Sequence, residues 1–160
     1  MRPHRPVART AILVLLGALA LSGCGSSVAG NAVVDPVSDA DRTLVDAYVA
    51  ASNRAGDAGP EEQLRYLRAN QEPGVPPPPD RCFEAITVRT RVVERTLRPA
   101  TPDWRPSTAT ATRPRPQGAV YVVAASASVM AGGVLVREDV ESDFLVIRDG
   151  RVYGYAMCRA

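Results

Sequence analysis

The sequence predicts an α+β fold in which two N-terminal helices pack on a curved four-stranded antiparallel sheet. Three observations support this prediction. A helical stripe of apolar residues runs through 39–55, alternation of apolar and polar residues begins after Cys82, and Asp149-Gly150 has the composition of a two-residue hairpin turn. Helices followed by strands are the element order of domains whose helices cover one face of a sheet. We expect a signal peptide and a flexible tether to precede this domain.

The first 23 residues have the composition of a secretory signal peptide. Three arginines form a basic segment (Arg2, Arg5 and Arg9), and the apolar run 11–21 that follows is too short to span a bilayer permanently. Leu21-Ser22-Gly23-Cys24 comes next and resembles the lipobox of bacterial lipoproteins. The resemblance implies cleavage after residue 23 and attachment of lipid to the Cys24 thiol. The alternative is an ordinary signal peptide followed by an unmodified cysteine.

Loss of the signal peptide changes which chemistry the chain can perform. It removes the only histidine, His4, and three of the 19 basic residues, which leaves 16 arginines against 17 acidic residues. Without histidine there is no Ser-His-Asp triad and no histidine-liganded zinc, and without lysine there is no Schiff base and no P-loop. A net charge near zero gives no support for nucleic-acid binding. We therefore expect no cofactor, no metal and no catalytic residue.

Two cysteines remain in the mature chain, Cys82 and Cys158. Disulfides persist in exported proteins, and the chain has neither a CxxC pair nor a cluster of metal ligands. We expect Cys82 and Cys158 to pair, and the bridge would contribute about 4 kcal/mol on the chain-entropy view of disulfides. A free pair with a redox or metal role is the alternative.

The mature chain divides into a tether and one domain. Residues 24–37, which begin with the acylated cysteine, are small and polar and show no period, so they are typical of a flexible tether with a reach of about 20 Å. Residues 38–160 are long enough for a single domain with its own core.

Two helices begin this domain. Ser38-Asp39-Ala40-Asp41 has the spacing of a capping box, and the first helix is expected over about 39–55, ending at Gly56. Its apolar stripe comprises Leu44, Val45, Tyr48, Val49 and Ala51 or Ser52. Gly59-Pro60 opens the second helix, which would turn Leu64 and Leu67 toward the core and Arg65 and Arg68 outward.

A proline-rich connector and a first strand follow. The prolines 76–79 exclude a helix and favour a stiff spacer into Cys82, with a proline-rich ligand for another domain as the alternative. Residues 84–97 alternate as a strand with a bulge at Val92-Val93. Its two faces carry Ile86, Val88, Thr90 and Val92 on one side and Thr87, Arg89 and Arg91 on the other.

The segment 98–118 is rich in proline and has no period, so it is predicted as a long irregular connection. It contains the only tryptophan, Trp104. Trp104 is either a loop anchor on the core, which we favour because buried aromatic area stabilises a loop, or an exposed recognition residue.

Three further strands complete the sheet. The strand 119–130 carries Tyr121, Val123, Ala125, Ala127 and Val129 on one face and ends at Ala131-Gly132-Gly133. The next strand is expected to bury the face of Val134, Val136, Val140, Phe144 and Val146 and to expose Arg137, Asp139, Glu141 and Asp143. Asp149-Gly150 sets a register in which Val146 faces Tyr153 and Phe144 faces Tyr155.

Over residues 38–160 this element order, with the Asp149-Gly150-Arg151 hairpin ending at Cys158, resembles the nuclear-transport-factor-2-like, or cystatin-like, cone of small exported actinobacterial proteins. In that fold the sheet and helices enclose a pocket. The resemblance implies a pocket lined by Tyr48, Tyr121, Phe144, Tyr153, Tyr155 and Met157. The alternative is that these side chains simply fill the core of a small domain.

Three classes of function remain. The first is a non-enzymatic, lipid-anchored accessory or ligand-binding domain on the outer face of the plasma membrane, which holds a small apolar ligand or docks a membrane protein. The second is a protein-docking module that uses the proline-rich segments and Trp104. The third is a small proton-transfer enzyme with Asp143 or Glu141 beside a tyrosine, which the predicted solvated face of both acids disfavours.

Overall fold

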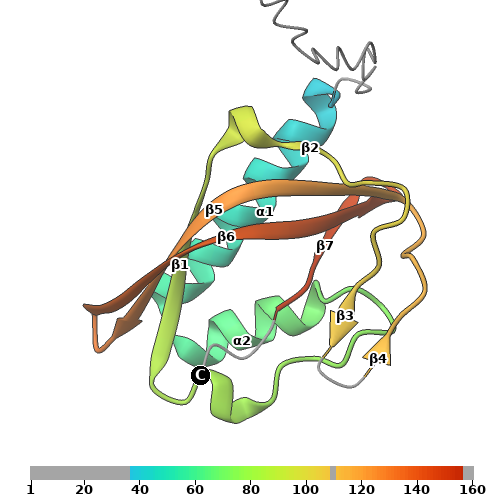
Figure 1. The fold of residues 1–160 in the computed structure, drawn as a ribbon. Helices are drawn as coiled ribbons and strands as arrows, with labels where there is room; N and C mark the ends of the chain where they lie inside the picture. The colour runs from blue at the N-terminus through green and yellow to red at the C-terminus, as the bar shows by residue number, and fades with distance from the viewer. Residues whose placement is uncertain (1–36, 109–110, 157–160) are drawn as a thin grey trace, which may run out of the picture. The chain divides into compact units, whose positions relative to one another are not determined.

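The computed structural model describes residues 37–108 and 111–156 (Figure 1). Two α-helices come first, α1 (Asp39–Ala58) and α2 (Pro60–Ala69). The main sheet contains β1 (Ile86–Val92), β2 (Arg98–Pro99), β5 (Ala119–Ala131), β6 (Val134–Arg148) and β7 (Arg151–Gly154). Short elements complete the fold: the 3-10 turns η1 (Asp80–Cys82) and η2 (Glu94–Thr96), and the strands β3 (Ser107–Thr108) and β4 (Ala111–Thr112).

The sheet is antiparallel and its principal strands follow the order β1-β5-β6-β7, which is the predicted meander. It curls into a half-barrel, and the two helices pack on its inner side, so the α+β class is confirmed (Figure 1). The predicted signal peptide, 1–23, and the tether residues 24–36 lie outside the described residues, so both stay predictions. Val37, the last residue assigned to the tether, instead belongs to the domain, because it is buried in the same cluster as Val45.

Helix α1 begins where the capping pattern predicts. The Ser38 side chain accepts a hydrogen bond from the Asp41 backbone N–H at 3.1 Å, which satisfies one of the donors that the first helical turn leaves unpaired. The predicted end at Gly56 is wrong, because the helix continues to Ala58 and ends at Gly59, whose φ is 134°. Gly56 has another role: a Cβ there would meet the side chain of Gln63 on α2. The glycine allows the two helices to approach each other.

Replacing the cap tests this start. Ser38→Ala should lower the free energy of unfolding by about 1 kcal/mol, because the N–H of Asp41 loses its partner while no buried side chain is disturbed. Chemical denaturation of the two proteins measures the difference. Ser38→Asp, which keeps an oxygen acceptor, should retain the wild-type value, and equal losses in both variants would contradict a capping role.

The predicted strand 84–97 is interrupted by more residues than the single bulge expected at Val92-Val93. Strand β1 pairs with β5 up to Val92, opposite Ala125, and pairing resumes at Arg98, opposite Val122. Five residues of the chain therefore lie opposite only two of β5, and they form an arch through η2. The backbone of Ala124 keeps its hydrogen bonds, because its carbonyl accepts from the Val93 N–H at 2.8 Å and its N–H donates to the Thr96 hydroxyl at 2.9 Å.

The predicted burial of the first half of β6 is wrong, and a bulge accounts for part of the difference. Val129 lies opposite Arg137 and Met130 opposite Leu135, so Val136 is an extra residue and the alternation reverses there. Val134, Val136 and Val140 were expected on a buried face, but they are 66%, 58% and 84% exposed. The expectation holds only at the other end of the strand, where Val146 is fully buried.

Each face of the sheet carries its own apolar cluster. The face toward the helices packs Val45 of α1 against Val123 and Leu145, and further along it packs Leu64 of α2 against Val88 and Ala127. Among the described residues, the outer face carries an apolar cluster near β7, where the segment after β2 packs on it. This segment includes β3 and β4, so the prediction that 98–118 contains no regular element is wrong in detail. Asp149 and Gly150 both have positive φ, and Val146 pairs with Tyr153 as predicted.

Two amide side chains cover the outer edge of β1. The Asn53 side chain of α1 donates to the Thr90 carbonyl and accepts from the Thr90 N–H, both at 2.8 Å. Gln63 of α2 does the same for Val88, at 2.6 Å and 2.8 Å, and also donates to the Ser52 carbonyl at 3.3 Å. The two helices thus supply the hydrogen bonds that a further strand would supply, which protects the edge from pairing with another chain.

Candidate functional site

The six predicted pocket residues are not gathered around one space. Tyr48 and Tyr121 belong to the cluster on the helix side of the sheet. Phe144, Tyr153 and Tyr155 belong to the cluster on the outer face. Met157 lies outside the described residues. In the described part of the chain, the sheet therefore separates the predicted lining residues into two groups, each of which fills a core.

The tyrosines on the helix side are held by hydrogen bonds. Tyr121 donates from its hydroxyl to the Asp41 carboxylate at 2.7 Å, and burial together with this carboxylate raises the pKa of Tyr121 to about 12. Tyr66 donates to the Tyr48 carbonyl at 3.0 Å, and the two rings lie 5.7 Å apart. Burial also raises the pKa of Tyr48 well above its ordinary value, with smaller contributions from Tyr66 and Asp143. These phenols therefore stay neutral at physiological pH.

The acidic residues of β6 lie on the opposite side from the one predicted. Asp139, Glu141 and Asp143 were expected on a solvated face, but in the register they lie opposite Ala127, Ala125 and Val123, all buried toward the helices. The reason is that the outer face, with Phe144, is the one the helices leave uncovered. All three acids are half-buried. Asp139 accepts a hydrogen bond from Arg137 at 2.9 Å.

Trp104 packs on the outer cluster. Its ring stacks on Phe144 with 4.2 Å between centroids and an interplanar angle of 15°, and it meets Tyr155 edge-on at 5.5 Å. These contacts support the loop-anchor interpretation of Trp104 over that of an exposed recognition residue.

Of the three cysteines, the structure describes one, Cys82. Cys82 is buried, in η1, and is disulfide-bonded. Cys24 and Cys158 lie outside the described residues, so the lipidation of Cys24 and the pairing with Cys158 stay predictions. No group of three or more His, Cys, Asp or Glu side chains within the described residues could hold a metal ion. Among the described helices, none is long and apolar enough to cross a membrane.

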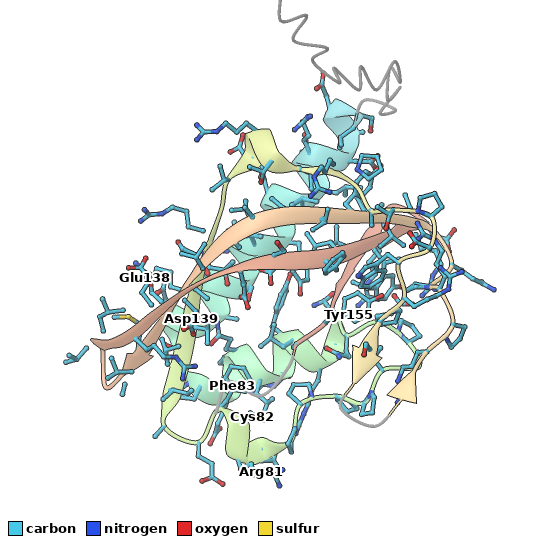
Figure 2. The ribbon with its side chains drawn as sticks, in the orientation of Figure 1. Arg81, Cys82, Phe83, Glu138, Asp139 and Tyr155 are labelled. Carbon is cyan, nitrogen blue, oxygen red and sulfur yellow. The ribbon has the colours of Figure 1, made fainter. Side chains whose placement is uncertain are left out.

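The closed end of the β5–β6 hairpin is the most unusual part of the surface. It projects at the left of Figure 1, and Figure 2 shows Glu138 and Asp139 near it, far along the sheet from Tyr155. Four large apolar side chains of β6 are more than half exposed, namely Val134, Leu135 and Val136 directly after the turn and Val140 further along the strand, opposite Ser126. We call these four residues the hairpin tip. Clustered exposed apolar side chains are typical of interaction sites.

A hollow lies beside the hairpin tip. Its volume is about 570 Å³, and it is bounded by Gly132 and Gly133 of the turn and by Asp57 of α1 and Arg89 of β1, among others. Asp57 and Arg89 form an ion pair at 2.5 Å in which both side chains are more than half exposed. The two glycines have φ of 56° and 81°, which is the conformation that a two-residue turn between strands requires.

Sequence reasoning assigned Val134, Val136 and Val140 to a buried face because it assumed unbroken alternation through 134–146. One signal was present. Val134, Leu135 and Val136 are three consecutive apolar residues next to a turn, and one face of a strand cannot bury all three. A bulge at this point would have been a reasonable prediction.

Comparison of the chain with protein-family models, with curated proteins and with solved structures finds no match. The resemblance to nuclear-transport-factor-2-like domains therefore stays a prediction. The function is argued below from the surface itself.

Proposed function

We propose that this protein is a non-enzymatic docking module, anchored by lipid on Cys24 at the outer face of the plasma membrane, that binds a membrane protein through the hairpin tip. The observation that carries the proposal is the exposure of the tip, where Val140 alone is 84% exposed. Full burial of an exposed valine or leucine side chain contributes about 1.5 to 3 kcal/mol to the free energy of association. Each tip residue would contribute a part of this, in proportion to the fraction of it that is now exposed.

The other two classes of function receive less support. A small-ligand site needs an enclosed space, and the predicted lining residues instead fill two clusters on opposite faces of the sheet. A proton-transfer site needs an acid beside a reactive group. Asp143 influences Tyr48, but the Tyr48 phenol has a raised pKa and holds its proton firmly. The contact surface also differs from the alternative that used Trp104, because that ring is packed on Phe144.

Charge favours a protein partner over a lipid surface. The residues that flank Val140 on β6, 137–139 and 141–143, include four acids and one arginine. An anionic bilayer would repel this segment as the tip approached it. A protein groove with apolar walls and basic side chains at its border would accept both the tip and its acidic surroundings.

Site-specific crosslinking in intact cells tests the proposal. A photoreactive residue in place of Val140 should give a discrete heavier protein adduct, and the adduct should disappear when Val134, Leu135 and Val136 are all replaced by serine. The triple substitution should leave the fold intact, because all three side chains are more than half exposed. The matched control places the same photoreactive residue at Ala47, an exposed position on α1, and should give no adduct.

Two results would contradict the proposal. One is the absence of a tip-dependent adduct in cells that express the acylated protein. The other is tip-dependent binding of the protein, with Cys24 replaced by alanine, to vesicles of phosphatidylglycerol. That second result would assign the tip to the lipid surface.

A further inference from the structure

Glu72 is a buried acid in a poorly satisfied environment. Its side chain is only 4% exposed, and its nearest cation is Arg148, whose Nη1 lies 3.7 Å from Oε1. This separation is longer than a hydrogen bond. The second carboxylate oxygen, Oε2, is buried and has no hydrogen-bond partner. Burial of an ionised carboxylate is costly unless it is well paired, so the position does not suit a charged Glu72.

Two other buried polar atoms of the described residues are also without a hydrogen-bond partner, the Tyr155 hydroxyl and Arg113 Nε. Burial and, after it, the charge of Glu72 raise the pKa of Tyr155 well above its ordinary value, which places the two groups within electrostatic reach. An ionised Glu72 needs donors to both of its oxygens, and the Tyr155 hydroxyl, which has no partner, does not donate to Oε2. The neutral acid therefore fits this environment better than the carboxylate does.

The outer-face cluster that contains Tyr155 is covered by a segment we call the strap, which comprises residues 100–105 and 113–116. Trp104 of the strap rests on Phe144 and Tyr155. Arg115 donates from Nη1 to the Thr101 carbonyl at 2.7 Å, which joins the two parts of the strap. Arg113 donates to the carbonyl of Gly74, in the turn that begins at Glu72.

We propose that ionisation of Glu72 loosens the strap, so that the outer face of the sheet is closed when Glu72 is neutral and opens when Glu72 becomes charged. Opening would hydrate the carboxylate and release Trp104 from Phe144. The elements packed around Glu72 contribute three arginines and two tyrosines, namely Arg148 of β6, Tyr153 of β7, Tyr155 after β7, and Arg113 and Arg115 of the strap. Arg148 also lies over the Tyr153 ring, 4.8 Å from its centroid, so its guanidinium is shared between Tyr153 and Glu72.

The pKa of Glu72 in the closed state sets the direction in which pH changes the opening of the strap. Burial raises the pKa of Glu72 above its ordinary value of 4.5, and Arg148 offsets only part of this. The pKa of Glu72 is higher in the closed state than in the open state, where the carboxyl is hydrated. At a pH between these two pKa values, the closed state binds up to one more proton than the open state. Closure is therefore complete at acid pH and weakens as the pH rises through this window, by up to about tenfold in the opening equilibrium per pH unit.

Trp104 reports on the strap directly, because it is the only tryptophan of the chain. The experiment records Trp104 emission of the full-length protein in detergent between pH 4 and 8, together with hydrogen exchange of the Ala100 amide, which donates to the Val120 carbonyl in the closed state. We expect emission to shift to the red with rising pH, and Ala100 exchange, corrected for its chemical pH dependence, to increase by up to about tenfold per pH unit.

Glu72→Gln should abolish both transitions and keep the strap closed, because glutamine is neutral throughout. Glu61→Gln, at an exposed position of α2, is the matched control and should behave as wild type. The proposal is overturned if the wild type shows no transition, or if Glu72→Gln shows the same one. Should that variant fail to fold, the ¹³C titration of the Glu72 carboxyl in the wild type decides, since a midpoint different from that of the Trp104 shift excludes Glu72 as the group responsible.

Discussion

Gln63→Leu should lower the free energy of unfolding by about 3 kcal/mol. Gln63 is 1% exposed, and its amide satisfies both the N–H and the carbonyl of Val88 on the outer edge of β1. Leucine fills a similar volume, so the loss comes from the two backbone groups of Val88, which remain buried without partners. Urea denaturation followed by far-ultraviolet circular dichroism gives the difference.

A matched substitution separates this effect from a general intolerance of leucine. Gln117 is exposed in the segment before β5, and Gln117→Leu should change stability by no more than about 0.5 kcal/mol. Gln63→Glu should be at least as harmful as Gln63→Leu at neutral pH, because a carboxylate cannot donate to the Val88 and Ser52 carbonyls. A small loss for Gln63→Leu would mean that β1 moves to find other partners for its edge.

Gly154→Ala should destabilise the domain by about 2 to 4 kcal/mol. Gly154 ends β7, and a Cβ built on it would overlap the hydroxyl of Tyr48 on α1. Neither the Gly154 backbone nor the Tyr48 side chain can move away easily. The Gly154 backbone is held by hydrogen bonds, at 2.9 Å to the Asn70 carbonyl and 3.0 Å from the Glu72 N–H, and Tyr48 is packed in the helix-side cluster. Overlap of this kind in a packed interior forces backbone shifts.

A double-mutant cycle identifies the cause. Tyr48→Phe removes the oxygen that the new methyl group would meet, so the double variant should recover more than half of the stability that Gly154→Ala loses. Thermal unfolding of the four proteins measures the coupling. If the two losses simply add, the damage arises from the backbone of Gly154 instead of from its contact with Tyr48.

Local patterns predicted the helices well because capping and apolar periodicity act over a few residues. Ser38 begins α1 and Pro60 begins α2 as expected. The end of α1 was misplaced because two glycines, Gly56 and Gly59, both follow the apolar stripe. Gly59 has the positive φ that ends the helix, whereas Gly56 is needed for the approach of Gln63. A sequence does not show which glycine meets a distant side chain.

The candidate surface was missed for two reasons. The extra residue Val136 places Val134 and Val140 on opposite faces of the sheet, although unbroken alternation would place them on one. Alternation alone cannot tell which of two faces the helices cover. For this reason Asp139 was expected in solvent and Val140 in the core, and each lies on the other face.

By itself, the sequence determined the element order, the Asp149-Gly150 hairpin with its register and the confinement of the only histidine to the first residues, because turn chemistry, periodicity and composition are local properties. Only the tertiary structure decided which face of the sheet is buried, how Asn53 and Gln63 cover the edge of β1, and where Glu72 is buried beside Tyr155. These features join residues that are distant in the chain. They follow from the requirement that the folded backbone satisfy its buried polar groups and exclude water, which no short segment can meet alone.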